Sequence, residues 1–277
     1  MEKFEKIAEI LDISILKVKV ILGLPLRECQ ALSAEKARDI FMGARDEEEK
    51  YSALLKWMTL TSSWDEALKA YQSVERESDE EIIALRRMVE LITNFDQALT
   101  TFTEADAVIA DLGEEYDPVY ATFYDQSLAS ALTLCQNFEE ARQLWDLDVL
   151  GDEDRVLIFP VWLNVCQTSD NFEEMLTEFS DEDSEENKVK IEMINQRWQE
   201  LFSERINSAK SFEACAEAYA TCPPEQELKN GAVKKWLQHC YSVDEVESVY
   251  EGIYTEDYSS EMEKDIVKKF YQVMVGY

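Results

Sequence analysis

The sequence predicts an all-α fold, and two observations support this prediction. Only 7 glycines and 5 prolines occur in 277 residues, and a β-rich fold needs more turn residues than that. In addition, one short pattern occurs six times along the chain, with apolar residues spaced as on one face of an α-helix. Since 46% of the residues are hydrophobic and 11% aromatic, the chain is able to bury a large core.

Each copy of the pattern begins with Ser or Asn, followed by a large apolar residue, which is its origin, and then an acid. An apolar residue stands three positions after the origin and an aromatic residue seven positions after it. Ser and Asn are preferred N-caps, and an acid near the N-terminus is favoured by the helix dipole. The copies therefore predict equivalent helix starts, with origins at Trp64, Phe95, Phe138, Phe172, Phe212 and Val243. A weaker copy stands at Ser33–Ala37, with Phe41 at its aromatic position.

The segment before each copy has a pattern of its own. Ten residues before the origins stand Leu54, Leu85, Leu128, Trp162, Phe202 and Val233. Six residues before them stand Met58, Val89, Leu132, Cys166, Ile206 and Leu237. All are apolar, at offsets that did not define the copies. The origins lie 31 to 43 residues apart, which fits two helices and two turns, so the sequence predicts helical hairpins.

Local signals place the first helices of these hairpins. Acidic residues 46–49 open a helix through Met58, Asp117 with Pro118 opens another that ends near Cys135, and Gly113 stops the helix that begins at Phe95. The remaining helices are expected at 80–92, at 154–166, at 187–208, at 226–240, and from Ser260 through Met274. We expect Pro160 to bend its helix or delay its start, and Ser260 with Glu263 to form a capping box.

Residues 4–22 predict one or two further helices. The run from Ile7 to Leu22 faintly resembles a helix-turn-helix, but its second helix offers only Lys17 and Lys19 as cations. A capping helix that covers the first repeat is the stronger interpretation.

The charge of the chain limits its partners. With 59 acids against 27 bases the net charge is −32, which disfavours direct binding to nucleic acid phosphates and to anionic membranes. A basic protein partner, or solubility alone, fits this charge better. No apolar run is long enough to span a membrane, and Met1–Lys6 lacks the features of a signal peptide. Six scattered cysteines are then expected as reduced thiols, which indicates a cytoplasmic protein.

The sequence offers little for catalysis or for a bound cofactor. His239 is the single histidine and stands at a predicted helix end, so no nucleophilic triad can be assembled without it. The cysteines form no Cys-x-x-Cys pair, and the glycines are isolated. We therefore predict no enzyme, metal or cofactor. The aromatic residues of the copies, Tyr250 included, are expected in the core.

The copies resemble the second helix of the tetratricopeptide-like (TPR-like or Sel1-like) repeats, where an aromatic residue, an Ala and a second aromatic residue stand at the same offsets. Trp64, Ala67 and Tyr71 match this pattern, as do the copies at Phe95 and Phe138, whereas Met175, Cys215 and Val246 replace the Ala. The small residue of the family's first helix is also replaced, by Leu55, Arg86 or Lys234. The resemblance covers about residues 32–257, flanked by capping segments at 1–31 and 258–277. It implies a right-handed α-solenoid of six to seven irregular hairpins that binds a protein or peptide in its groove.

Eight residues before the origins, where the family's first helix faces the groove, stand Lys56, Arg87, Asn164 and Lys235, with Arg86 and Lys234 beside them. Such cations suit an acidic or C-terminal segment of a partner. Pairing with nearby Glu on their own helices is the stronger interpretation of these residues. We therefore expect a non-enzymatic adaptor or scaffold. Two alternatives are an acidic mimic or chaperone for a basic protein, including one that binds nucleic acid, and a regulator that uses the weak helix-turn-helix.

Overall fold

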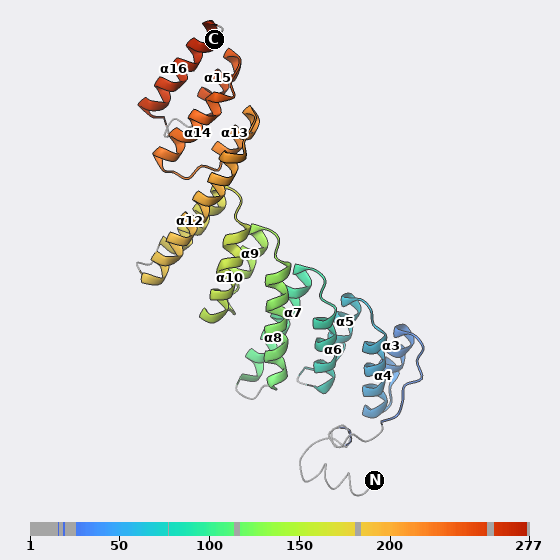
Figure 1. The fold of residues 1–277 in the computed structure, drawn as a ribbon. Coiled ribbons are helices and arrows are strands. Elements are labelled where there is room, and N and C mark those ends of the chain that lie inside the picture. Colours follow the sequence, from blue (N-terminus) through green and yellow to red (C-terminus); the bar gives the residue numbers. More distant parts are fainter. Residues whose placement is uncertain are drawn as a thin grey trace. The chain divides into compact units, whose positions relative to one another are not determined.

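The structure is a computed structural model of the 277-residue chain, and it describes residues 16, 19, 26–76, 78–113, 117–180, 184–253 and 258–275. Over these residues it contains fourteen α-helices, labelled α3 to α16, and no strand (Figure 1). The prediction of an all-α fold is therefore confirmed. None of these helices combines the length and the apolar composition that a membrane crossing requires.

The predicted N-terminal helices, and with them the helix-turn-helix, fall outside the described residues except at Leu16 and Lys19. Lys19 is one of the two cations that this motif offered to DNA. Its Nζ lies 2.6 Å from Oε2 of Glu48, and this hydrogen bond lowers the pKa of the Glu48 carboxyl. Lys19 is therefore already engaged by an acid of its own chain.

The chain forms two compact units. The first holds α3 (Ala34–Gly43), α4 (Glu47–Leu60), α5 (Trp64–Tyr71), α6 (Asp79–Glu90), α7 (Phe95–Leu112) and α8 (Pro118–Leu134), together with Asp146–Leu150. The second holds α9 (Phe138–Trp145), α10 (Asp152–Val165), α11 (Ser169–Ser180), α12 (Glu185–Ser208), α13 (Phe212–Tyr219), α14 (Gln226–Gln238), α15 (Val243–Gly252) and α16 (Ser260–Val275).

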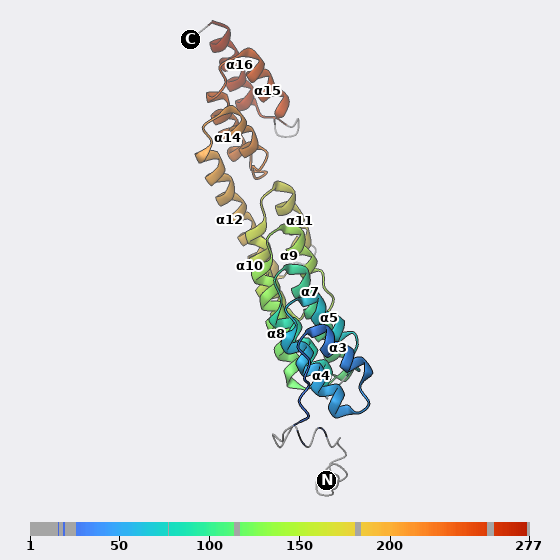
Figure 2. The same cartoon turned by 90° about the vertical axis from the view of Figure 1, so that its right-hand side faces the viewer.

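Within each unit the helices pair in sequence order. The helix that carries a copy of the motif makes its main contact with the helix that follows it, as α5 does with α6 and α13 with α14. The predicted hairpins pair it instead with the helix before it, but α4 and α5, for example, contact each other less. Helices two positions apart also touch: α4 contacts α6, α6 contacts α8, and α14 contacts α16. Figure 1 shows α4, α6 and α8 side by side, and Figure 2 shows α14, α15 and α16 lying together. Each unit is therefore built from neighbouring helical hairpins.

The predicted caps explain where most motif helices begin. Helices α5, α7, α9, α13 and α15 start at the predicted origins. In each case the Ser or Asn before the origin accepts a hydrogen bond from the N–H three residues on; these caps are Ser63, Asn94, Asn137, Ser211 and Ser242. The weak copy is also a helix, since Ser33 caps α3 and both Ala37 and Phe41 are buried. As predicted, Gly113 ends α7, with a positive φ of 59°.

Two predicted caps are wrong. Helix α11 starts three residues before Phe172, because Thr168 and Asn171 each accept a hydrogen bond from the other's N–H at 3.3 Å, so Asn171 lies inside the helix. At the start of α16 the hydroxyl of Ser259, not that of Ser260, accepts from the Met262 N–H at 3.2 Å. The Ser259 hydroxyl also donates to Asn230 Oδ1 at 2.7 Å, and this contact with α14 selects it over its neighbour.

Pro160 does not delay α10, which begins at Asp152 and contains the proline. Asp154 accepts a hydrogen bond from the Gly151 N–H at 3.1 Å, so the helix starts with its own cap eight residues before the proline.

The core is formed by the residues that define the repeat. All six apolar residues ten positions before the origins are at most 3% exposed. Nine of the eleven motif aromatics are buried as well, and Phe212 is half-buried. Tyr250 contradicts the prediction: it is 53% exposed, because Val246 and Val249 form the buried face of α15 instead.

Candidate functional site

In the first unit, the predicted groove cations are partly engaged by their own chain. Arg87 donates to the Thr61 carbonyl oxygen and to Glu90 Oε2, both at 2.6 Å. The alternative prediction, that these cations pair with Glu on their own helix, is therefore confirmed for Arg87. Lys56 is half-buried on α4, and Arg86 is exposed on α6. Neither of these two forms a hydrogen bond or an ion pair with the residues that the structure describes.

In the second unit, the predicted residues lie on two helices. Asn164 is exposed on α10. On α14, Lys235 Nζ donates to the Asn207 carbonyl oxygen at 3.3 Å, so Lys235 helps to hold the end of α12. Lys234 is 62% exposed and lies 4.0 Å from Asp265 of α16. Lys234 also lines a hollow.

This hollow, of about 190 Å³, lies between α14 and α16, and we call it the lysine groove. It is lined by Lys234, Leu237, Gln238, Asp265, Lys268, Lys269 and Gln272. Asp265 is the only acid among the described residues of the lining. Its carboxylate lies 4.0 Å from Lys234 and 3.5 Å from Lys268. Three lysines against one carboxylate give the groove a positive charge on a chain whose net charge is −32.

Lys269, which lines the lysine groove, also contacts an aromatic ring. Its Nζ lies 5.9 Å from the centre of the Tyr241 ring, which is an attractive cation–π distance. Nearby, the backbone N–H groups of Tyr241 and Ser242 lower the pKa of Glu245, and the charge of Lys269 adds to this effect. The start of α15 and the groove are therefore coupled electrostatically.

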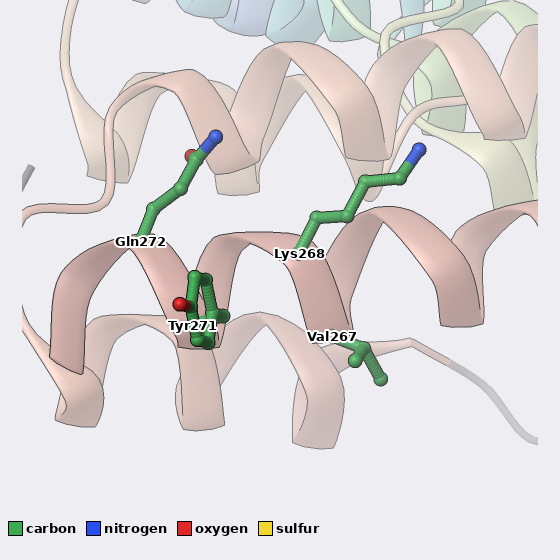
Figure 3. Close-up of a pocket in the computed structure, with 4 residues that line it drawn as sticks. All are labelled: Val267, Lys268, Tyr271 and Gln272. Atoms are coloured by element: carbon green, nitrogen blue, oxygen red, sulfur yellow. The ribbon is translucent and has the colours of Figure 1, made fainter. Parts of the chain in front are cut away.

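A second hollow, of about 550 Å³, adjoins the lysine groove on α16 and is lined by Val267, Lys268, Tyr271 and Gln272 (Figure 3). Figure 3 shows Lys268 and Gln272 projecting from one side of the helix and Val267 from the other. Val267, Tyr271 and Met274 are 60–65% exposed, and their spacing puts them on one face; we call them the apolar stripe. Since Lys268 and Gln272 line both hollows, the charged and apolar parts form one continuous surface.

The sequence prediction missed this surface because it treated α16 only as a cap. Ile266 is buried and Phe270 stands four residues later, as Leu237 stands after Val233, so α16 repeats the pattern of the earlier first helices. Lys268 then stands two residues after Ile266, which is where Lys56, Arg87, Asn164 and Lys235 stand in the other repeats. An alignment of α16 with the earlier first helices would therefore have identified Lys268 from the sequence.

The same alignment shows what is unusual about Tyr271. Its equivalents, five residues after each buried first-helix residue, are Thr59, Glu90, Thr133, Gln167, Asn207 and Gln238. All six are exposed and polar. This site on the first helix therefore faces solvent in all six other repeats and carries a polar residue in each of them. The aromatic Tyr271 is the exception in this row. A large apolar side chain at an exposed position is typical of a binding surface.

The first unit contains a partly buried polar network that joins four helices. Glu81 of α6 is 1% exposed and accepts a hydrogen bond from the Tyr120 hydroxyl of α8 at 3.0 Å. Arg76 lies 3.7 Å from Glu81 and donates to Glu104 of α7 at 3.2 Å, and Tyr71 of α5 also donates to Glu104, at 3.0 Å. Burial, together with these carboxylates, raises the pKa of both tyrosines. Because its members satisfy one another, this network is structural.

The cysteines and the histidine occupy structural positions. All six cysteines are free thiols, and burial raises the pKa of Cys166 to about 12 and of Cys240 to about 11. Such thiols carry little thiolate at neutral pH, which makes them poor nucleophiles. His239 is half-buried at the C-cap of α14. Within the described ranges, no three His, Cys, Asp or Glu side chains converge as metal ligands would.

Comparison of the chain with protein-family models, with curated proteins and with solved structures gives no significant match. The all-helical structure with paired neighbouring helices is compatible with a helical-repeat protein. The likeness to tetratricopeptide-like repeats therefore rests on the residues of this chain.

Proposed function

We propose that this chain is a non-enzymatic adaptor or scaffold, a right-handed α-solenoid of the tetratricopeptide-like kind, and that it binds an acidic segment of a protein partner. The lysine groove and the apolar stripe form the binding surface. The observation that carries the proposal is the combination on α16 of surplus lysine charge with the exposed Tyr271.

The chemistry of this surface defines the partner. Lys234 and Lys268 both lie near Asp265, which a carboxylate of the partner would join or replace as their counter-ion. Val267 and Tyr271 would take apolar side chains from the same segment, and an exposed Tyr supplies a large contact area. The partner is therefore a segment in which acids alternate with apolar residues. The six free cysteines support a reducing compartment for this interaction.

Fluorescence anisotropy tests the proposal, with a fluorescein-labelled peptide of about twelve residues in which Glu alternates with Leu. Charge reversal by Lys268→Glu should weaken binding by about tenfold. Lys210→Glu is the matched control, because Lys210 is an exposed lysine of the same unit that lies outside the surface. Its effect should stay within about twofold.

A second variant separates the two parts of the surface. Tyr271→Ser removes apolar contact without a change in charge, so it should weaken binding at low and at high salt alike, whereas the effect of Lys268→Glu should shrink as salt rises. Equal effects of Lys268→Glu and Lys210→Glu would mean that only the overall charge matters. That result, or no binding by the wild-type chain, would refute the proposal.

A further inference from the structure

A larger hollow, of about 700 Å³, lies elsewhere in the second unit, where the first turns of α10 and α12 meet the ends of α9 and α11. Its floor is aromatic: Trp145 and Phe179 are 5% and 3% exposed, and their rings meet edge to face at 5.4 Å. Val156 of α10 is 61% exposed and forms an apolar part of the wall. We propose that this hollow binds a segment of a protein partner in which basic side chains alternate with apolar ones.

The aromatic floor already attracts cations. The Arg155 guanidinium lies 5.4 Å from the Trp145 ring centre, and Lys190 Nζ lies 5.8 Å from Trp145 and 5.2 Å from Phe179. Cations are drawn to the faces of aromatic rings, and to indole most strongly. The hollow therefore presents a floor that suits cationic side chains, and two cations of this chain lie over it.

The charged side chains that line the hollow determine whether a partner segment should be acidic or basic. Among the described residues, four carboxylates line the hollow, from Asp152, Glu153, Glu178 and Glu186, against the two cations Arg155 and Lys190. Lys190 lies 2.7 Å from Glu186, so its charge is already matched. Trp145 Nε1 donates to Glu178 at 3.1 Å, which fixes this carboxylate at the floor. Asp152 and Glu153 are exposed in the first turn of α10. An anionic ligand would meet this surplus of carboxylates, whereas Arg or Lys would be attracted to it.

Exposed apolar side chains continue along both helices. Leu157 follows Val156 on α10 and is 54% exposed, and on α12 Val189 and Met193 are 55% and 43% exposed and lie one turn apart. A partner that offered only charge would leave these side chains in water. A segment with both basic and apolar residues covers them and reaches the carboxylates. Its charge is opposite to that of the segment proposed for the lysine groove, and the two proposals stand on different residues.

The test uses fluorescence anisotropy on the full chain, at an ionic strength of about 0.15 M, with a fluorescein-labelled peptide of about twelve residues in which Arg alternates with Leu. Glu153→Lys should weaken binding by about tenfold. Glu213→Lys is the matched control, because Glu213 is also an exposed glutamate in the first turn of a helix. Both substitutions therefore change the net charge, and the interaction of the side chain with the helix dipole, in the same way. This control should bind within about twofold of the wild-type chain.

Val156→Ser keeps the charge and should weaken binding by about threefold to tenfold. Met42→Ser on α3 should leave binding unchanged, because Met42 is 69% exposed but lies in the first unit, outside both proposed surfaces. Circular dichroism confirms that each variant is folded, and if Glu153→Lys does not fold, the comparison of Val156→Ser with Met42→Ser decides. Equal loss in Glu153→Lys and Glu213→Lys would show attraction to the overall charge of −32 and would overturn the proposal. No binding by the wild-type chain, or equal effects of Val156→Ser and Met42→Ser, would overturn it as well.

Discussion

Buried thiols make the stability of this protein depend on pH at the level of single residues. Cys166 is 0% exposed, its Sγ donates to the Trp162 carbonyl oxygen at 3.4 Å, and it lies 3.2 Å from the sulfur of Met175. Since burial disfavours the charged form, the pKa of this thiol rises from 9.0 to about 12. Cys240, at about 11, behaves in the same way.

The free energy of unfolding should therefore fall as the pH rises above about 9. From that pH the unfolded chain releases thiol protons that the folded chain still holds, so the unfolded state gains stability, by less than about 1.4 kcal/mol per pH unit for each thiol. Cys166→Ala removes one of these ionisable thiols. We expect its destabilisation, measured by urea unfolding with a reducing agent, to be smaller at about pH 10.5 than at about pH 8.5. Parallel pH profiles for the variant and the wild-type chain would contradict this expectation.

Glu81 shows what local sequence cannot predict about a residue. It is the third acid of the run Asp79-Glu80-Glu81, after the cap Ser78, and such a run is typical of a solvated helix start. Asp79 and Glu80 are half-buried, yet Glu81 is buried. Its burial depends on the hydroxyl of Tyr120, 39 residues away, and on the guanidinium of Arg76. No local pattern distinguishes the acid that has such distant partners.

At the scale of helices, the start of α16 shows that a tertiary contact can decide which residue caps a helix. The sequence Ser259-Ser260-Glu261-Met262-Glu263 offers two candidate caps, and the capping-box spacing favours Ser260. In the structure Ser259 is the cap, because its hydroxyl also reaches Asn230 of α14.

We expect Ser259→Ala to lower the free energy of unfolding by about 1 kcal/mol, since it removes both an N-cap and a tertiary hydrogen bond. Ser260→Ala is the adjacent control and should change it by less than about 0.5 kcal/mol. Urea unfolding followed by circular dichroism measures both variants. If Ser260→Ala costs as much as Ser259→Ala, the cap has been assigned to the wrong serine.

The same helix shows how far sequence can identify the candidate site. The row of polar residues led to Lys234 and Lys235, but Lys235 holds the end of α12 and only Lys234 lines the lysine groove. Lys268 and Lys269 were missed because the row was located by counting back from the motif origins, and α16 was treated as a cap. The hollow above Trp145 was missed because its parts come from four helices, and only tertiary packing brings them together.

At the scale of the whole molecule, sequence predicted the order of the helices well because their period is carried by many residues at once. It did not predict that each motif helix packs mainly against the helix after it. Two apolar rows, five of the six predicted caps and most motif aromatics agree on one register, so single failures such as Asn171 or Tyr250 leave it unchanged. The division into two compact units has no such marker in the sequence. It reflects where contacts between neighbouring helices are dense, and in repeat proteins stability is approximately the sum of such neighbour terms.

This organisation predicts that damage to one unit stays within that unit. Leu54 of α4 is 0% exposed, so Leu54→Ala leaves a cavity in the first unit and should cost about 2–5 kcal/mol there. Leu55→Ala, at the next position, is the control, because Leu55 is 38% exposed and should cost less than about 1 kcal/mol. Amide hydrogen exchange should then quicken in α3 to α6 of the Leu54→Ala variant, while α13 to α16 keep their protection, because each repeat depends on its neighbours and not on distant ones. Equally faster exchange in α13 to α16 would show that the chain unfolds as a single cooperative body, and the additive account of its stability would then be wrong.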